Sequence, residues 1–252
     1  LKSRDKMLGV LCLYLSAGIK LSDREIKTYN SIADIISVSL QNILSYREIK
    51  EHSKELLSLA DASNVILTTT TTTTTTTTYD VICDIAVRNF GLKMAWLGLI
   101  EEGSADIKPA AYAGFEDGYL SSVKITCDDS PTGMGPTGMA TKTKTARVVH
   151  DMETDPAYTP WKEQAIKRGY RSSIAVPMIS SEGRIMGALN LYSSEPQFFT
   201  EKRQKLFYVF ANHAAAAIEN RNLIQSLEEK VEERTRKLET AKEMAEAASR
   251  AK

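Results

Sequence analysis

The chain has 252 residues, and its 32 basic and 32 acidic side chains cancel to a net charge of zero. Hydrophobic residues make up 42% and charged residues 25%, as in an ordinary globular protein. A general nucleic-acid binder carries a basic excess, and a membrane-spanning helix needs roughly 18 consecutive apolar residues. We therefore expect neither a nucleic-acid partner nor a membrane segment in this chain.

The cysteines and the first residue bear on the origin of the chain. Cys12, Cys83 and Cys127 lie far apart, which argues against a disulfide framework or a cysteine-rich zinc site and fits a reducing, cytoplasmic location. The chain starts at Leu1 rather than Met, and an apolar pattern follows almost at once. We interpret it as an internal fragment of a longer protein.

The first third of the chain predicts a strand followed by a long helix. Residues 6–15 are apolar and β-rich, and Ser22 or Asp23 can cap a helix that has Glu25 in its first turn. No Gly or Pro interrupts the helical pattern up to about Leu67. Its apolar residues form more than one stripe, which is typical of a helix that serves two surfaces.

Residues 68–78 are threonine only. Eleven threonines would cost a helix roughly 5–7 kcal/mol relative to alanine, yet both flanks have helical patterns. Either this is a genuine homopolymer, or the threonines stand in for a segment whose identity was not assigned. We favour the second interpretation and draw no function from the run.

The remainder of the chain predicts a mixed domain that ends in a long helix. A short amphipathic helix over 79–89 is closed by Gly91. The strands expected after it cover residues 94–100, 107–113, 123–126, 146–150, 173–179 and 184–192. Helices are expected at 139–142, after a Gly/Pro loop, at 160–168 and from Glu201 onward.

Heptads written from Ala217 predict a coiled coil at the end of the chain. Asn220 and Arg234 are polar interruptions that lower stability but can hold the register. The alternative is a single solvated helix, but the apolar repeat favours a parallel homodimer. The expected dimer seam consists of Ile224, Leu227, Val231, Arg234, Leu238, Ala241 and Ala245.

An internal repeat defines the expected domain boundaries. Residues 7–14 and 21–25, followed by a helix, match residues 185–192 and 199–202, which are also followed by a helix. The first copy lacks everything before its last strand. We therefore predict the end of a truncated first domain over 1–50, a complete domain over 51–223, and a signalling helix over 224–252.

Two motifs of enzyme active sites are present only in outline. Residues 133–138, GMGPTG, match the dinucleotide-binding fingerprint, but no alternating strand–helix pattern surrounds them, and Met139 replaces the lysine of a phosphate loop. An acidic stretch over 151–155 reads as a solvated loop. The three histidines, His52, His150 and His213, have neither metal-ligand nor triad spacing. We therefore assign no metal ligand and no catalytic residue.

Aromatic and polar residues gather around the predicted helix at 160–168. Aromatics beside a few polar groups commonly line a small-molecule cavity, whereas plain packing of a lid on a sheet is the competing interpretation. The candidate ligand-binding residues are Trp96, Phe115, Tyr119, Tyr158, Trp161, Tyr170, Arg171 and Ser172.

Several stretches together resemble a GAF domain of bacterial and archaeal signalling proteins over residues 56–223. They are 82–87 (ICDIAV), 94–98 (MAWLG), 113–119 (AGFEDGY), 135–138 (GPTG), 155–156 with 160–161, 168–177 (RGYRSSIAVP) and 187–192 (GALNLY). Residues 1–50 look like the end of a preceding GAF domain. The resemblance implies an α+β fold, with helices flanking a six-stranded antiparallel sheet and a ligand cavity under a lid at about 131–169.

The same resemblance bears on the ligand. GAF domains bind cyclic nucleotides, bilins or haem, and many have no known ligand. No cysteine lies in 160–169, and Cys127 lacks the bilin pattern, which argues against covalent bilin. Asn190 is followed by Leu191, so most of the cyclic-nucleotide signature is missing, and only His150 offers a haem ligand. The cofactor stays unassigned.

The end of the chain resembles sensor histidine kinases. Residues 228–239 look like the helix that feeds their dimerisation domain, and residues 245–252 resemble the stretch before the phospho-acceptor histidine box, which is itself absent. We therefore expect no enzyme activity in this chain. The resemblance implies a sensory module of a tandem-GAF histidine kinase or, alternatively, a dimerisation spacer whose cavity is filled by its own side chains.

Overall fold

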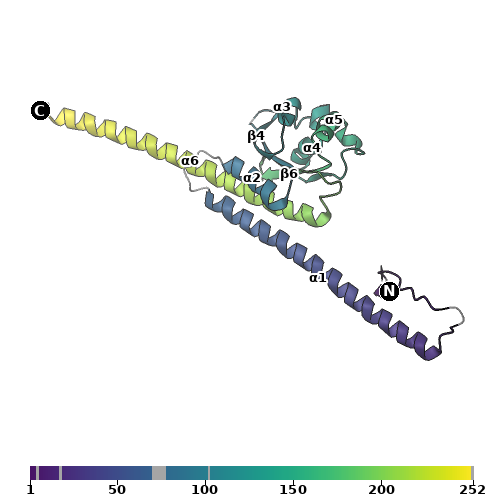
Figure 1. Cartoon of the computed structure of the whole chain (residues 1–252). Coiled ribbons are helices and arrows are strands. Elements are labelled where there is room, and N and C mark those ends of the chain that lie inside the picture. The colour runs from purple at the N-terminus through teal and green to yellow at the C-terminus, as the bar shows by residue number, and fades with distance from the viewer. Residues whose placement is uncertain (4–5, 17–18, 70–77, 102, 251–252) are drawn as a thin grey trace. The chain divides into compact units, whose positions relative to one another are not determined.

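The computed structural model describes residues 1–3, 6–16, 19–69, 78–101 and 103–250 (Figure 1). It consists of two compact units, Leu1–Leu57 and Ser58–Lys252. Most of the threonine run, residues 70–77, lies outside the described residues, so the interpretation of that run is untested. None of the helices in the described ranges combines the length and the apolar composition needed to span a lipid bilayer.

The first unit contains a short hairpin and most of helix α1 (Asp23–Thr69). The Ser22 hydroxyl and N–H both donate to the Glu25 carboxylate, at 2.6 and 2.8 Å, and the Glu25 N–H donates back to the hydroxyl. These bonds form a capping box, so of the two expected cap residues Ser22 is the one that caps the helix. The strand expected over 6–15 is wrong beyond its first two residues. Only β1 (Lys2–Ser3) and β2 (Lys6–Met7) pair, so residues 8–16 have no partner ladder in the described part of this unit.

The second unit alternates helices and strands around one sheet. Its elements are α2 (Thr78–Phe90), β3 (Met94–Ile100), β4 (Ile107–Gly114), α3 (Tyr119–Ser122), η1 (Pro131–Gly133), α4 (Pro136–Thr143), β5 (Arg147–Val149), η2 (Pro156–Trp161), α5 (Lys162–Lys167), β6 (Ser172–Ile179), β7 (Ile185–Ser193) and α6 (Glu201–Arg250). The strand order is β4-β3-β7-β6-β5, with every pair antiparallel.

The sheet has five strands in the described residues, and the expectation of six is wrong. The sixth was expected at 123–126, but there the chain makes only a single bridge, between Asp106 and Thr126. The Ile107 N–H donates to the Ile125 carbonyl, and by strand alternation the next outward position on β4 is Pro109. Pro109 has no N–H, so the ladder cannot continue.

The two faces of the sheet are covered by different layers (Figure 1). One face carries Leu97, Leu189, Leu191 and Val176, which pack against α2 and α6, where Phe90 meets Phe207 and Phe210 edge to face. The other face lies under the segments around α3, α4, η2 and α5. Because both faces are covered, the central strands are apolar at nearly every position rather than at alternate ones.

A close backbone approach fixes one position of the central strand β7. A Cβ on Gly187 would overlap the carbonyl oxygen of Gly98 on the neighbouring strand β3, and Gly187 has φ +154°. Any larger residue therefore has to push two central strands apart.

Gly187→Ala is expected to destabilise the fold by about 3 kcal/mol, because neither strand can move without disturbing the core. Gly103→Ala is the matched control: its φ of +79° also favours glycine, but nothing lies within 4 Å of an added Cβ. We expect the control to cost about 1–2 kcal/mol. Urea unfolding of both variants measures the difference, and equal losses would show that the close approach is not limiting.

Candidate functional site

Two adjacent strands, β6 and β7, form the floor of a pocket on the lid side of the sheet, and Trp96 of the neighbouring strand β3 lies behind it. Alternation places Trp96 of β3, Asn190 and Tyr192 of β7, and Ser173 and Ala175 of β6 on this face. The register sets Asn190 between Trp96 and Ala175, and Tyr192 beside Ser173. The floor is therefore a fixed part of the sheet rather than a loop.

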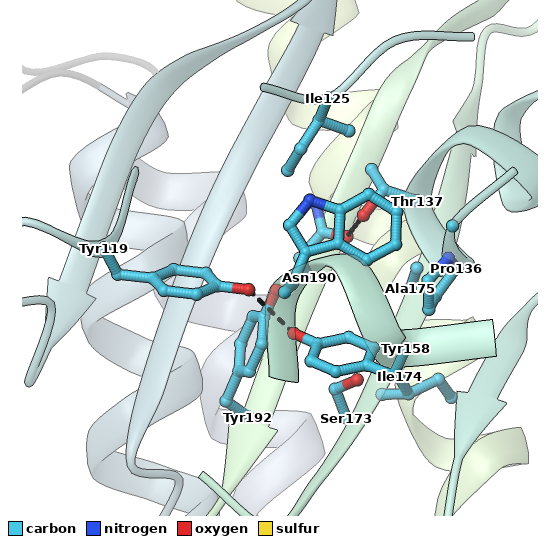
Figure 2. Close-up of a pocket in the computed structure, with 12 residues that line it drawn as sticks. Tyr119, Ile125, Pro136, Thr137, Tyr158, Ser173, Ile174, Ala175, Asn190 and Tyr192 are labelled. Atoms are coloured by element: carbon cyan, nitrogen blue, oxygen red, sulfur yellow. Dashed lines mark hydrogen bonds between the residues drawn. The ribbon is translucent and has the colours of Figure 1, made fainter. Parts of the chain in front are cut away.

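The roof of the pocket comes from the connections between the strands. Tyr119 begins α3, Pro136 and Thr137 begin α4, and Tyr158 and Trp161 lie in η2. Figure 2 shows the Tyr119 and Tyr158 side chains pointing toward each other beside Tyr192. Aromatic rings fill most of the space, and the remaining room is about that of a single water molecule.

A cluster of tyrosine hydroxyls lies in this pocket (Figure 2). The hydroxyls of Tyr119 and Tyr158 are 2.7 Å apart, and the indole N–H of Trp96 donates to the Tyr192 hydroxyl over 3.3 Å. Burial raises the pKa of Tyr119, Tyr158 and Tyr192 above the ordinary value of 10, because water no longer stabilises the phenolates. The three hydroxyls therefore stay neutral at physiological pH.

A buried amide joins α4 to the central strand. The Thr137 hydroxyl donates to Asn190 Oδ1 over 2.7 Å, and Asn190 Nδ2 donates to the Ala188 carbonyl over 3.2 Å. Both side chains are almost completely buried. Because an unpaired buried amide is costly, this pair fixes the start of α4 over the floor of the pocket.

The indole of Trp161 covers the first residues of α4. A Cβ on Gly135 would overlap the six-membered ring of Trp161, so this ring rests directly on the Gly135 backbone. Gly135 caps α4 with no side-chain hydrogen bond. The absence of a side chain at Gly135 is what allows the indole to close over the pocket.

A buried arginine ties the lid to the loop after β4. Arg168 is 8% exposed, and its guanidinium donates to the Asp117 carbonyl over 2.6 Å and to the Gln164 carbonyl over 2.9 Å. It also lies over the Tyr119 ring, with 5.7 Å between the guanidinium carbon and the ring centroid. Arg168 thus joins the end of α5 to the start of α3 above the pocket.

Three of the eight predicted ligand residues, Tyr119, Tyr158 and Trp161, line the pocket. Trp96 and Tyr170 lie in the same aromatic cluster but behind the lining, and the Tyr170 hydroxyl donates to the Phe115 carbonyl.

The other three predicted residues lie away from the pocket. The Phe115 ring is half exposed under Lys93, with Nζ 4.9 Å from its centroid. Arg171 pairs with Asp151 and Glu153, at 3.3 and 3.2 Å. The Ser172 hydroxyl donates to the Glu195 carbonyl over 2.6 Å, which is expected because neighbouring strand residues face opposite sides of a sheet.

Sequence reasoning missed the floor of the pocket. Asn190 was considered only as part of an incomplete nucleotide signature, although a lone amide inside an apolar strand is a signal for a buried polar contact. Tyr192 belongs to the same strand, and Thr137 to the Gly/Pro loop. The further lining residues absent from the prediction are Ile125, Gly135, Pro136, Ser173, Ile174 and Ala175.

The described residues hold no cluster that suits a metal ion, because no three His, Cys, Asp or Glu side chains in those ranges gather closely enough. Burial raises the pKa of the Cys83 thiol to about 12, which leaves it unreactive. Hydroxyl groups and one amide line the pocket.

Comparisons with known proteins identify the fold. A family model described as "GAF domain" matches residues 72–219. The GAF domain of a phosphoenolpyruvate-protein phosphotransferase from Coxiella burnetii superposes with a TM-score of 0.55 at 15% identity, covering 69% of this chain and 98% of its own.

Two other solved structures are similar, and a comparison with curated proteins finds no match. A free methionine-R-sulfoxide reductase from Neisseria meningitidis gives a TM-score of 0.53 at 21% identity, with 66% of this chain and 89% of the reductase covered. The bacteriophytochrome RpBphP3 from R. palustris gives 0.52 at 12% identity, covering 71% of this chain and 40% of its own. At these identities the likeness establishes the fold alone.

The raised tyrosine pKa values predict a loss of stability in base. In the unfolded chain the tyrosines ionise near pH 10, whereas the buried ones hold their protons, so the unfolded state loses protons first. The free energy of unfolding should therefore fall as pH rises above about 10, by up to about 1.4 kcal/mol per pH unit for each tyrosine.

Urea unfolding between pH 8 and 11.5 measures this slope. Tyr158→Phe should make the slope shallower, because one resistant group is gone, and Tyr112→Phe, at a half-exposed ring, controls for the loss of a hydroxyl outside the pocket. If the free energy of unfolding falls equally steeply with pH in both variants and in the unchanged protein, Tyr158 does not contribute to the loss of stability in base.

Proposed function

This chain belongs to the GAF domain family, and we propose that it is a sensory module that passes a signal from its pocket to a dimeric coiled coil formed by α6. GAF domains are generally sensory or regulatory. The proposed role is regulatory rather than catalytic, and the likeness to the reductase supports the fold.

A single feature of α6 carries this proposal. The helix is continuous over 50 residues. Its first half packs Phe210, Ala214 and Ile218 in the core of the second unit. Beyond residue 220 the same helix exposes an apolar stripe, with Leu227 52%, Val231 63% and Leu238 71% exposed. Any rotation that the sheet imposes on the first half is carried into the stripe.

The stripe has the composition of an unpartnered coiled-coil seam. Burying each Leu or Val against a second helix contributes about 1.5–3 kcal/mol, so a few such residues can hold a dimer. Arg236 and Lys237 pair with glutamates one turn earlier, at 4.0 and 2.6 Å, away from the stripe. Arg234 interrupts the seam and would keep it adjustable. Ala245 also belongs to the expected seam, but its side chain lies outside the described residues.

A chain of hydrogen bonds supports a route from the pocket to α6. Lys144, at the end of α4, donates through Nζ to the Gly183 carbonyl over 2.6 Å. Gly183 lies at the tip of the β6–β7 hairpin, and there the Ser181 N–H and hydroxyl both donate to the Glu219 carboxylate, at 3.0 and 2.8 Å. These bonds lower the pKa of Glu219 and hold it ionised. Movement of α4 would therefore pull on α6.

The finer identity of the parent protein rests on the sequence. Residues 228–239 and 245–252 resemble the helix leading into sensor histidine kinases, and residues 1–50 resemble the end of a preceding GAF domain. We propose a tandem-GAF sensor kinase as the parent. A reducing cytoplasm suits its three scattered cysteines.

The second candidate is a dimerisation spacer that binds no ligand. It is favoured by the aromatic filling of the pocket, which leaves room for about one water molecule. Both functions require the dimer, but only the sensor requires a ligand. Native mass spectrometry separates them, since the sensor predicts a dimer that carries an added small mass and the spacer predicts a bare dimer.

Leu227→Glu is expected to weaken the dimer by at least tenfold, because it puts two carboxylates into an apolar seam. Thr240→Glu is the control, since the same charge then lies outside the predicted a and d positions. Arg234→Leu should tighten the dimer by about tenfold by restoring the seam. Sedimentation equilibrium over a concentration series measures all three, and a monomer at every concentration would refute the coiled coil.

Breaking the hairpin link is expected to isolate α6 from α4. Lys144→Ala should speed amide hydrogen exchange around Glu219 severalfold, and it should no longer do so in a Glu219→Gln background. Lys142→Ala is the control, because that lysine on α4 binds Asp129 and the Asp128 carbonyl instead. Exchange around Glu219 that responds equally to both lysine variants would exclude the hairpin as the link.

A further inference from the structure

The lining of the pocket limits the charge of any ligand. None of the side chains that line the pocket in the described part of the chain is charged. Its polar groups are the tyrosine hydroxyls together with Thr137, Ser173 and Asn190. A charged ligand would be buried without a counter-charge, and the partial charge of one helix end offsets only a small part of that cost. The lining therefore selects a neutral molecule.

One hydroxyl of the floor has no partner. Ser173 is 4% exposed and lines the pocket beside Tyr192. Within the described ranges its hydroxyl makes no hydrogen bond, whereas the hydroxyls of Thr137 and Tyr158 are both paired. Buried hydroxyls are nearly always paired, so Ser173 is available for a group that the chain itself does not supply.

The start of α4 offers donors to the same space. Gly135 provides no side-chain cap, Pro136 at the first position has no N–H, and Pro136 and Thr137 both line the pocket. The first-turn N–H groups of a helix have no carbonyl partner within the helix. Together with the Ser173 hydroxyl they form a set of donors that suits an oxygen acceptor such as a carbonyl.

The Trp161 indole fills the space over Gly135, and its shape indicates which ligand shape that space accepts. The Trp161 ring rests on Gly135 and lines the pocket with Tyr158, their ring centroids 5.8 Å apart. The remaining space is about one water molecule, so a ligand has to displace the indole. A flat ring of similar size would make the contacts that the indole now makes.

We propose that the pocket binds a small, uncharged, planar aromatic compound with a carbonyl-type oxygen, which replaces the Trp161 indole and accepts hydrogen bonds from Ser173 and the start of α4. The proposal rests on the sensory function above and names its ligand class. Entry of the ligand moves Trp161 off Gly135, which changes the packing at the start of α4.

Two probes with one ring system test the charge. Indole-3-carboxamide is neutral and carries a carbonyl, whereas indole-3-carboxylate is an anion at pH 7. Isothermal titration and ligand-observed NMR on the full chain should show saturable binding of the amide, with the carboxylate at least tenfold weaker. Equal or tighter binding of the carboxylate would overturn the proposal.

Two variants test the residues. Ser173→Ala should weaken amide binding about fivefold, as expected for one lost neutral hydrogen bond, while Ser121→Ala, outside the pocket, should not change it. Trp161→Ala should tighten amide binding, because the indole no longer competes. If circular dichroism shows that Trp161→Ala does not fold, the Ser173 comparison decides alone. The proposal is refuted if neither the unchanged protein nor a folded Trp161→Ala variant binds the amide. It is also refuted if Ser173→Ala binds the amide as tightly as the unchanged protein does.

The same samples separate this inference from the proposed function. Sedimentation of the chain reports whether it dimerises, whatever the pocket binds. A dimer that fails to bind the amide contradicts the ligand class and leaves the dimeric module standing. A monomer that binds the amide contradicts transmission through α6 and leaves the ligand class standing.

Discussion

The fold depends on the burial of the central strands β7 and β6 on both faces. Their alternating side chains serve two different layers: Leu189, Leu191 and Val176 hold α2 and α6, whereas Asn190 and Tyr192 face the lid. Because successive residues of a strand point to opposite sides, a pocket residue and a residue of the helical layer are covalent neighbours. Pocket and helix are thus mechanically close although the sheet separates them.

Covering both faces of the sheet buries polar side chains, and specific residues supply their hydrogen-bond partners. Polar groups on a doubly covered sheet must be paired, and Thr137 supplies the partner of the Asn190 amide over 2.7 Å. The tyrosine hydroxyls lie close together, with Tyr119 and Tyr158 at 2.7 Å. The Ser173 hydroxyl lines the pocket and makes no hydrogen bond within the described residues, so it is open to a group from outside the chain.

The C-terminal half of α6 follows a different rule. Its apolar stripe has no partner in the described residues of this chain, and in the proposed dimer a second helix buries it. The polar Arg234 in that stripe lowers the stability of the proposed seam. Two packing arrangements of the seam are then closer in free energy. A seam of marginal stability is what a transmitting helix requires, because a small bias at the domain can then shift it.

The sequence by itself determined the local patterns: the helix cap at Ser22 or Asp23, the helix that begins at Glu201, the strand pairs around 94–113 and 173–192, and the family resemblance. These depend on propensity and periodicity, which act over a few residues. Only the tertiary structure decided that Pro109 stops the sheet at five strands, that Ser172 and Arg171 point away from the pocket, and that Asn190 and Ser173 form its floor. Those outcomes depend on strand register and on which layer covers each face, and both are set by contacts between residues far apart in the chain.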